Sequence, residues 1–235
     1  MIAALFVDSR GCYAGLPDVD CWDESRDARL YAGPHPVVAH PPCSRWCRLA
    51  GLVEARWHGV TVGKGKRRRV AQCKRGDDGG CFASALASIR RWGGVLEHPA
   101  YSDAWAAHDL NAPPTGGGWV NADMLGGWTC YVEQSRYGHL AKKATWLYAL
   151  GIELPSLRWG FVADRDCQSV GLAEWRDCET RRARAPVSWC GNHTAADEDR
   201  PRVGKRAAAA TPPEFRDVLI AMARTAGPLP EPREE

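Results

Sequence analysis

The stretch Val37-Val38-Ala39-His40-Pro41-Pro42-Cys43 decides the fold class of this chain. Its first three residues are apolar and two of them are β-branched, which favours a short buried strand. A strand cannot continue through two prolines, because proline lacks the backbone N–H that a sheet needs. The side chain that follows, Cys43, is therefore predicted at the carboxyl edge of a sheet, where α/β folds place their sites.

The segments on either side of this stretch alternate between strand and helix patterns. Strands are predicted at 2–8, in a stretch that ends near Trp22-Asp23, at 94–97 and at 129–134, and an apolar segment covers 145–150. Helices are predicted at 24–31, at 81–92 before Gly93-Gly94, and at 212–222 from the Pro212-Pro213 pair onward. Strands that alternate with helices indicate an α/β sheet flanked by helices.

Three parts of the chain lack apolar periodicity. Residues 51–78 and 111–128 are rich in glycine and are predicted to be loops, while residues 158–203 form an irregular region rich in Arg, Asp, Trp and Cys. We expect a main domain at 1–157 that residues 204–226 complete, a small separate region at 158–203, and a disordered tail at 227–235.

The composition is that of a soluble globular protein. The 235 residues carry a formal net charge of +3, and no apolar run approaches the roughly 20 residues that span a bilayer. The N-terminus is apolar but lacks a basic leader, so it is interpreted as a buried strand and not as a signal peptide. Ten cysteines without such a signal indicate a reducing compartment, and we expect a monomeric cytoplasmic protein that binds no membrane.

A block of positive charge follows Cys43. Eight lysines and arginines, and no acidic residue, lie between residues 56 and 75. Such a block suits contacts to DNA phosphates, although a solvated loop has the same composition. The candidate DNA-binding residues in and before this block are Arg45, Lys64, Lys66, Arg67, Arg68 and Arg69.

Several short motifs occur in an order that resembles the cytosine-C5 DNA methyltransferase family, especially its short phage-type members. In chain order they are Phe6 with Gly11, Asp23, Pro41-Pro42-Cys43, Val95-Leu96-Glu97-His98-Pro99, Gln134-Ser135-Arg136 with the stretch up to Leu147, and Ala208 to Pro213. The resemblance covers residues 3–150 and 204–222. It implies a Rossmann-like class I methyltransferase sheet with a small target-recognition insertion at 158–203.

The resemblance also implies a set of roles. Cys43, as a thiolate with a lowered pKa, would add to C6 of a flipped cytosine. Glu97, with a pKa raised enough to be protonated, would bind the N3/N4 edge of the base, and Arg136 would hold O2. S-adenosylmethionine would supply the methyl group, and Gln134 would lie near the DNA. The residues expected to bind this cofactor are Phe6, Gly11, Asp23, Pro42 and Thr211.

The chain also departs from the family pattern. Asp8 stands in place of the first glycine, His98 and Gly138 replace an asparagine and an arginine, and Ala208-Ala209 replaces Gly-Asn. Two alternatives therefore remain, a pyrimidine-C5 modification with another donor and a DNA-binding protein without catalysis. An amino-methyltransferase carries Asp/Asn-Pro-Pro-aromatic at the strand end, which His40 and Cys43 fit poorly.

The irregular region contains a candidate zinc site. Cys167, Cys178, Cys190 and His193 have the spacing C-x10-C-x11-C-x2-H, which lacks the short cysteine pairs of common zinc sites. Free cysteines packed in a small region are the alternative interpretation.

Overall fold

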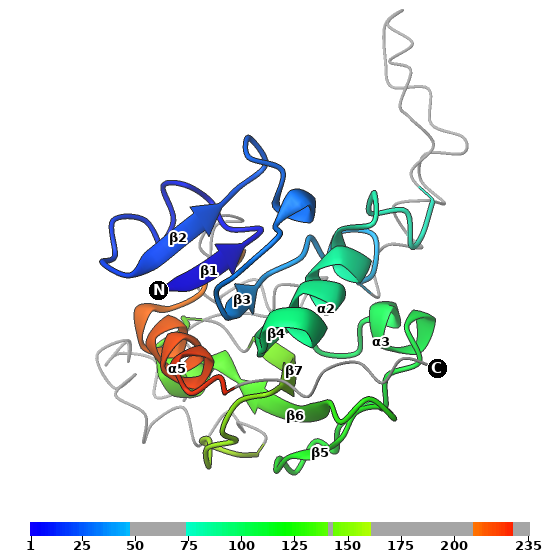
Figure 1. The fold of residues 1–235 in the computed structure, drawn as a ribbon. Helices are drawn as coiled ribbons and strands as arrows, with labels where there is room; N and C mark the ends of the chain where they lie inside the picture. Colours follow the sequence, from blue (N-terminus) through cyan, green and yellow to red (C-terminus); the bar gives the residue numbers. More distant parts are fainter. Residues whose placement is uncertain (48–73, 141–142, 161–208, 228–235) are drawn as a thin grey trace, which may run out of the picture.

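One seven-stranded mixed sheet organises the protein (Figure 1). The computed structural model describes residues 1–47, 74–140, 143–160 and 209–227. The strand order is β2-β1-β3-β4-β7-β6-β5. A helix packs against each face, α2 (Cys81–Trp92) on one and α5 (Pro213–Arg224) on the other, so the expected α/β class with flanking helices is confirmed.

Four strands form a parallel half of the sheet: β1 (Ile2–Leu5), β2 (Val19–Trp22), β3 (Val37–Ala39) and β4 (Gly94–Pro99). In this half β1 lies between β2 and β3, and β4 pairs with β3. The chain therefore leaves β1 toward β2 on one side and comes back to β3 on the other side. The connections thus change direction between β1 and β3, and open α/β sheets bind their ligands beyond the carboxyl ends of the strands at such a switch point.

The other half of the sheet is antiparallel. Strand β7 (Ala144–Leu150) runs between β4 and β6 (Trp128–Glu133), and β6 pairs with the short β5 (Val120–Asn121). Because β7 runs opposite to β4 and β6, its first residues lie beside the last residues of both neighbours. Thr145 pairs with Pro99 of β4, and Ala144 pairs with Glu133 of β6.

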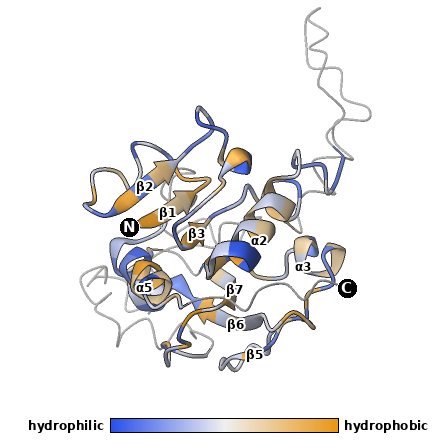
Figure 2. Ribbon diagram, viewed as in Figure 1, coloured by the Kyte–Doolittle hydropathy of each residue, from blue (hydrophilic) through white to orange (hydrophobic). Residues whose placement is uncertain are grey.

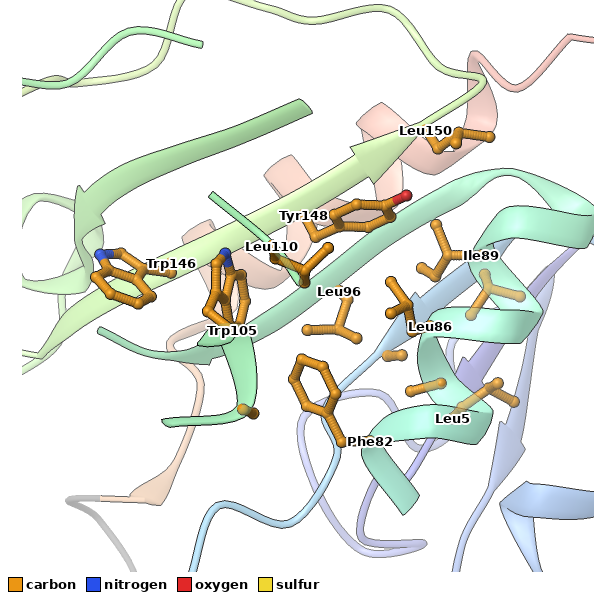
Figure 3. Packing of buried hydrophobic residues seen from close by; sticks show 14 of the residues in the cluster. Leu5, Phe82, Leu86, Ile89, Leu96, Trp105, Leu110, Trp146, Tyr148 and Leu150 are labelled. Carbon is orange, nitrogen blue, oxygen red and sulfur yellow. The ribbon is translucent and has the colours of Figure 1, made fainter. Parts of the chain in front are cut away.

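Successive residues of the central strands face opposite sides of the sheet, as the twofold period of a strand requires. Leu5 and Leu96 pack in the cluster that holds α2, whereas Ala4 and Val95 pack in the cluster that holds α5. Both faces are thus apolar, and β1 is coloured hydrophobic along its length in Figure 2. Figure 3 shows the α2 side of the sheet, where the helix faces Leu5 and Leu96.

Gly94 fixes how closely β3 and β4 approach each other. Its φ is +133°, and a Cβ atom at this position would lie 1.9 Å from the carbonyl oxygen of Val37. A side chain cannot be accommodated at that distance, so the junction from α2 into β4 requires glycine.

The predicted elements differ from the observed ones mainly at short or glycine-rich segments. The expected helix at 24–31 is wrong: only the 3-10 helix η1 (Ala28–Leu30) forms there, because Asp27 has a left-handed backbone with φ 51°. The expected loop at 111–128 contains β5 and the start of β6, and α3 (Asp103–Ala107) had no prediction. Strand β1 ends at Leu5 and not at residue 8.

Candidate active site

Residues with predicted catalytic or DNA-binding roles lie together at the carboxyl edge of the parallel strands. Cys43 follows β3, Glu97 lies near the end of β4, and Gln134 opens the 3-10 helix η2 (Gln134–Tyr137) directly after β6. The start of β7 lies at the same edge because that strand is antiparallel. Residues from four separate parts of the sequence therefore come together here.

The loop that carries Cys43 is held in place by hydrogen bonds and by one buried tryptophan. The Cys43 carbonyl accepts from the backbone N–H of Trp46 (3.0 Å) and of Cys47 (2.9 Å), which closes a tight turn. The Trp46 side chain is buried, packs against Phe82, and donates its Nε1 hydrogen to Asp78 Oδ2 (2.8 Å). The Cys43 thiol is half-buried in this turn.

Glu97 is buried, with 6% of its surface exposed, and both of its carboxylate oxygens are hydrogen-bonded. Oε2 accepts from His40 Nδ1 at 2.8 Å, and Oε1 accepts from Gln134 Nε2 at 2.8 Å. Gln134 Nε2 also donates to Thr145 Oγ1 at 2.9 Å. Buried carboxylates are stable only with such partners, so this network fixes the orientation of Glu97.

A second hydrogen bond fixes His40 from the opposite side. The Tyr13 hydroxyl lies 2.8 Å from His40 Nε2, and Tyr13 itself is buried. Burial raises the pKa of Tyr13 well above its usual value, so its hydroxyl stays protonated and donates to Nε2. His40 Nδ1 then carries the hydrogen that Glu97 accepts. Tyr13, His40 and Glu97 thus form a continuous hydrogen-bonded chain.

The charges of the site differ from those that the resemblance implies. Burial acts to raise the pKa of Glu97, but the positive charge of Lys143 and the hydrogen bond from His40 lower it to about 2. The pKa of Cys43 is raised, first by burial and then by the negative charge of Glu97. In the protein without substrate these directions favour an ionised Glu97 and a protonated Cys43 thiol, the opposite of the protonation states that the resemblance implies.

Arg136 lies two residues beyond Gln134, on η2. Its Nε donates to the Gly160 carbonyl oxygen at 3.3 Å, and its own carbonyl oxygen accepts from Arg158. Gln134, which is predicted to lie near the DNA, is fully buried in this structure and contacts Glu97.

Four of the candidate cofactor residues follow β1 or β3 or precede α5. Phe6 follows β1 with a left-handed backbone (φ 59°), and the Gly11 N–H donates to the Asp8 carbonyl oxygen at 2.8 Å. Pro42 is in the loop after β3. Thr211 precedes α5, and the first turns of this helix contact the loop after β1, since Arg216 Nη1 donates to the Cys12 carbonyl oxygen at 2.6 Å.

Asp23 follows β2 but is engaged by its own turn. Its Oδ1 accepts from the backbone N–H of Ser25 (3.0 Å) and of Arg26 (3.1 Å) and from the Ser25 hydroxyl (2.6 Å). These donors, with the Ser25 side chain first, lower the pKa of Asp23. The carboxylate caps the residues after β2, which is a structural role as well as a candidate binding role.

Several predicted residues lie outside the described residues. These are the basic residues Lys64, Lys66, Arg67, Arg68 and Arg69 and the candidate zinc ligands Cys167, Cys178, Cys190 and His193. Arg45 is described, and its carbonyl oxygen accepts from the Gly76 N–H at 2.9 Å. Within the described ranges no group of three or more His, Cys, Asp or Glu could hold a metal ion, and no helix is long and apolar enough to cross a membrane.

Four residues of the site had no predicted role: His40, Tyr13, Thr145 and Lys143. His40 stands next to the predicted nucleophile loop, but its partner Glu97 is 57 positions away in the sequence. Comparison of the chain with protein-family models, with curated proteins and with solved structures gives no match.

Proposed function

We propose that this protein is a DNA cytosine-C5 methyltransferase that uses Cys43 as its nucleophile. The observation that carries the proposal is the position of a half-buried thiol and a buried, ionised carboxylate at one sheet edge, the thiol in the loop after β3 and the carboxylate near the end of β4. The position of β1 between β2 and β3 supports a Rossmann-like methyltransferase sheet as the finer description of the fold.

Glu97 has the acceptor capacity that the proposed substrate needs. A carboxylate offers about four acceptor sites, and the close hydrogen bonds of Glu97 come from His40 and Gln134. Acceptor sites therefore remain for the N3/N4 edge of a cytosine flipped out of the DNA helix. Because its orientation is already fixed, Glu97 would bind the base with little reorganisation.

The resting protonation states supply the proton that the addition requires. The Cys43 S–H bond breaks and its electron pair forms the bond from sulfur to C6. The C5–C6 π pair moves to C4–C5, and the C4–N3 π pair takes up a proton at N3. Glu97 would accept the thiol proton and pass it to N3, so the completed addition leaves no net charge on the ring. Later loss of the C5 proton expels the sulfur and restores the aromatic ring.

S-adenosylmethionine, when bound, would supply the methyl group for C5. We place the cofactor at the carboxyl edge of β1 and β3, next to the Asp8–Gly11 turn, which is tight: a Cβ atom at Gly11 would lie 3.0 Å from the Asp8 carbonyl oxygen. The residues that would hold the cofactor are Phe6, Gly11, Pro42 and Thr211, with Asp23 at the end of β2.

The first experiment is a trapping assay with DNA that contains 5-fluorocytosine. Its fluorine cannot leave as a proton does, so the Cys43–C6 bond would persist as a covalent complex on a denaturing gel. Wild-type protein with S-adenosylmethionine should form the complex, and Cys43→Ser should not. A folded wild-type protein that forms no complex on such DNA would contradict the proposal.

A second candidate function keeps the pyrimidine chemistry and changes the donor. It is favoured by Asp23, whose Oδ1 already accepts three hydrogen bonds from its own turn. Calorimetry with S-adenosylmethionine decides between the two. Binding in the micromolar range that is weakened in Asp23→Ala supports S-adenosylmethionine as the methyl donor. A titration of folded protein that shows no binding of S-adenosylmethionine supports another donor.

A further inference from the structure

Lys143 has a fixed position at the sheet edge that carries Glu97. It precedes β7, and its carbonyl oxygen accepts from the Gln134 backbone N–H (3.0 Å) and from Thr145 Oγ1 (3.1 Å). The Gln134 side chain contacts Glu97 Oε1, and Thr145 Oγ1 lies 3.5 Å from the same oxygen. The residues that hold the carboxylate therefore also hold the backbone of Lys143.

The ammonium group of Lys143 is only partly engaged. Its Nζ donates to the carbonyl oxygens of Ala209 and Ala210, both at 3.1 Å. An ammonium group has three donor hydrogens, and carbonyl oxygens carry no formal charge that would neutralise it. In the part of the chain that the structure describes, no carboxylate lies within 4 Å of this nitrogen. One donor hydrogen and the full positive charge thus remain available to the site.

The field of this charge reaches both groups of the proposed reaction. The charge of Lys143 is the first of the causes that lower the pKa of Glu97. The pKa values of Cys43 and of Cys12, in the loop after β1, are raised by burial, and the charge of Lys143 is a smaller effect that opposes this rise. Arg136, the arginine that the resemblance selects, has its Nε on the Gly160 carbonyl oxygen. The cation that acts on the thiol and the carboxylate is a lysine from a different segment.

We infer that Lys143 is the cationic residue of this site, and that its ammonium group stabilises negative charge on the Cys43 sulfur and on a bound pyrimidine ring. The stabilisation of the ring rests on the proposed function, whereas the stabilisation of the Cys43 thiolate does not. Stabilising the thiolate increases the fraction of Cys43 that can attack. A cation near the ring would stabilise the negative charge that develops there during sulfur addition, before N3 is protonated.

The test uses the full chain and two substitutions of one residue. Lys143→Gln removes the charge but keeps amide donors for Ala209 and Ala210, and Lys143→Arg keeps the charge. The readout is the rate of Cys43 alkylation by iodoacetamide, followed by mass spectrometry of the Cys43 peptide from pH 7 to pH 10. Cys21 and Cys81, which lie on other elements, serve as internal references in the same sample.

We expect Lys143→Gln to move the pH–rate profile of Cys43 to higher pH by about one unit. Alkylation at pH 8 should then be only about threefold slower, because the thiolate that remains is more nucleophilic and this partly offsets its smaller fraction. Lys143→Arg should stay within about twofold of wild type. A remote cation, Arg224 in the last turn of α5, provides the control: Arg224→Gln should change nothing. An unchanged Cys43 profile in Lys143→Gln would overturn the inference.

The trapping assay separates this inference from the proposed function. Slower alkylation in Lys143→Gln together with no wild-type complex on 5-fluorocytosine DNA would support the role at sulfur and reject the methyltransferase. A wild-type complex with equal alkylation in both variants would reject the role of Lys143 alone. Melting temperatures of the variants exclude a general loss of structure as the cause of either result.

Discussion

At the scale of single residues, Glu97 has opposite effects on the two properties of Cys43 that can be measured. Its negative charge raises the pKa of the thiol, and its carboxylate is the proposed acceptor of the thiol proton. Electrostatics alone would make Glu97 unfavourable for the nucleophile. The proposed chemistry makes it necessary.

We predict that Glu97→Gln makes Cys43 more reactive toward iodoacetamide and inactive toward DNA. Loss of the negative charge lowers the pKa of Cys43, so alkylation at pH 8 should become several-fold faster. The same substitution removes the proton carrier, so the 5-fluorocytosine complex should form at least about a hundredfold more slowly. If both rates change in the same direction, Glu97 does not have the proposed role.

His40 acts on the reaction through Glu97, and a pair of substitutions separates its hydrogen bond from its ring. His40→Leu leaves Glu97 Oε2 without its 2.8 Å donor, which should slow complex formation by about ten- to a hundredfold, the usual worth of a hydrogen bond to a charged group. His40→Asn keeps an N–H near the position of Nδ1 and should recover most of that loss. Equal rates for the two variants would argue against a positioning role.

At the scale of elements, the sequence patterns predicted the helices and strands correctly where apolar residues recur at a regular spacing. The helix at Cys81–Trp92 was predicted with its observed bounds, because apolar residues recur along one side of it and glycines follow it. The helix expected at 24–31 failed because Asp23 and Asp27 hydrogen-bond to nearby backbone N–H groups and favour turns. Strand β6 was predicted at 129–134, whereas its short partner β5 lies in a glycine-rich stretch without strand alternation, so no local signal indicated β5.

The site was predictable only in part for a related reason. Cys43 stands out after two prolines, and Glu97 ends a predicted strand. Their contacts with His40, Gln134 and Lys143 depend on the antiparallel insertion of β7 between β4 and β6, which no short pattern encodes. The protonation states depend on burial and on neighbouring charges, and these exist only in the folded chain.

A substitution at Gly94 tests how closely β3 and β4 must approach. We predict that Gly94→Ala lowers the free energy of unfolding by about 3 kcal/mol or more, because its Cβ would lie 1.9 Å from the Val37 carbonyl oxygen at a φ of +133°. Urea denaturation measures the change. Gly116→Ala is the matched control, since a Cβ there meets nothing within 4 Å, and it should leave the midpoint nearly unchanged.

At the scale of the whole molecule, two buried groups should make stability fall in two stages as the pH decreases. Burial lowers the pKa of His98 from 6.5 to about 4, and the pKa of Glu97 is lowered from 4.5 to about 2. In both cases the unfolded chain binds the proton at a higher pH than the native state. The contribution of His98 is therefore complete above about pH 6.5 and is lost toward pH 4, and that of Glu97 is complete above about pH 4.5 and is lost toward pH 2.

Urea denaturation between pH 7.5 and pH 3.5 measures this dependence. We expect the free energy of unfolding of the wild type to begin to fall below pH 6.5, by up to about 3 kcal/mol over the first stage. In His98→Asn the first stage should be absent, while the decrease below pH 4.5 remains. A wild-type curve that stays flat from pH 7 to pH 5 would contradict the buried neutral state of His98.

The position of helix α5 near the C-terminal end of the fold has a consequence for the protein during its synthesis. It covers the face of the sheet formed by Ile2, Ala4, Val38 and Val95, yet it lies at residues 213–224. The central strands leave the ribosome long before α5 does, so the nascent chain exposes an apolar surface during most of its translation. Chaperones that bind exposed hydrophobic segments have their target there, and a premature stop codon before residue 213 leaves an aggregation-prone polypeptide.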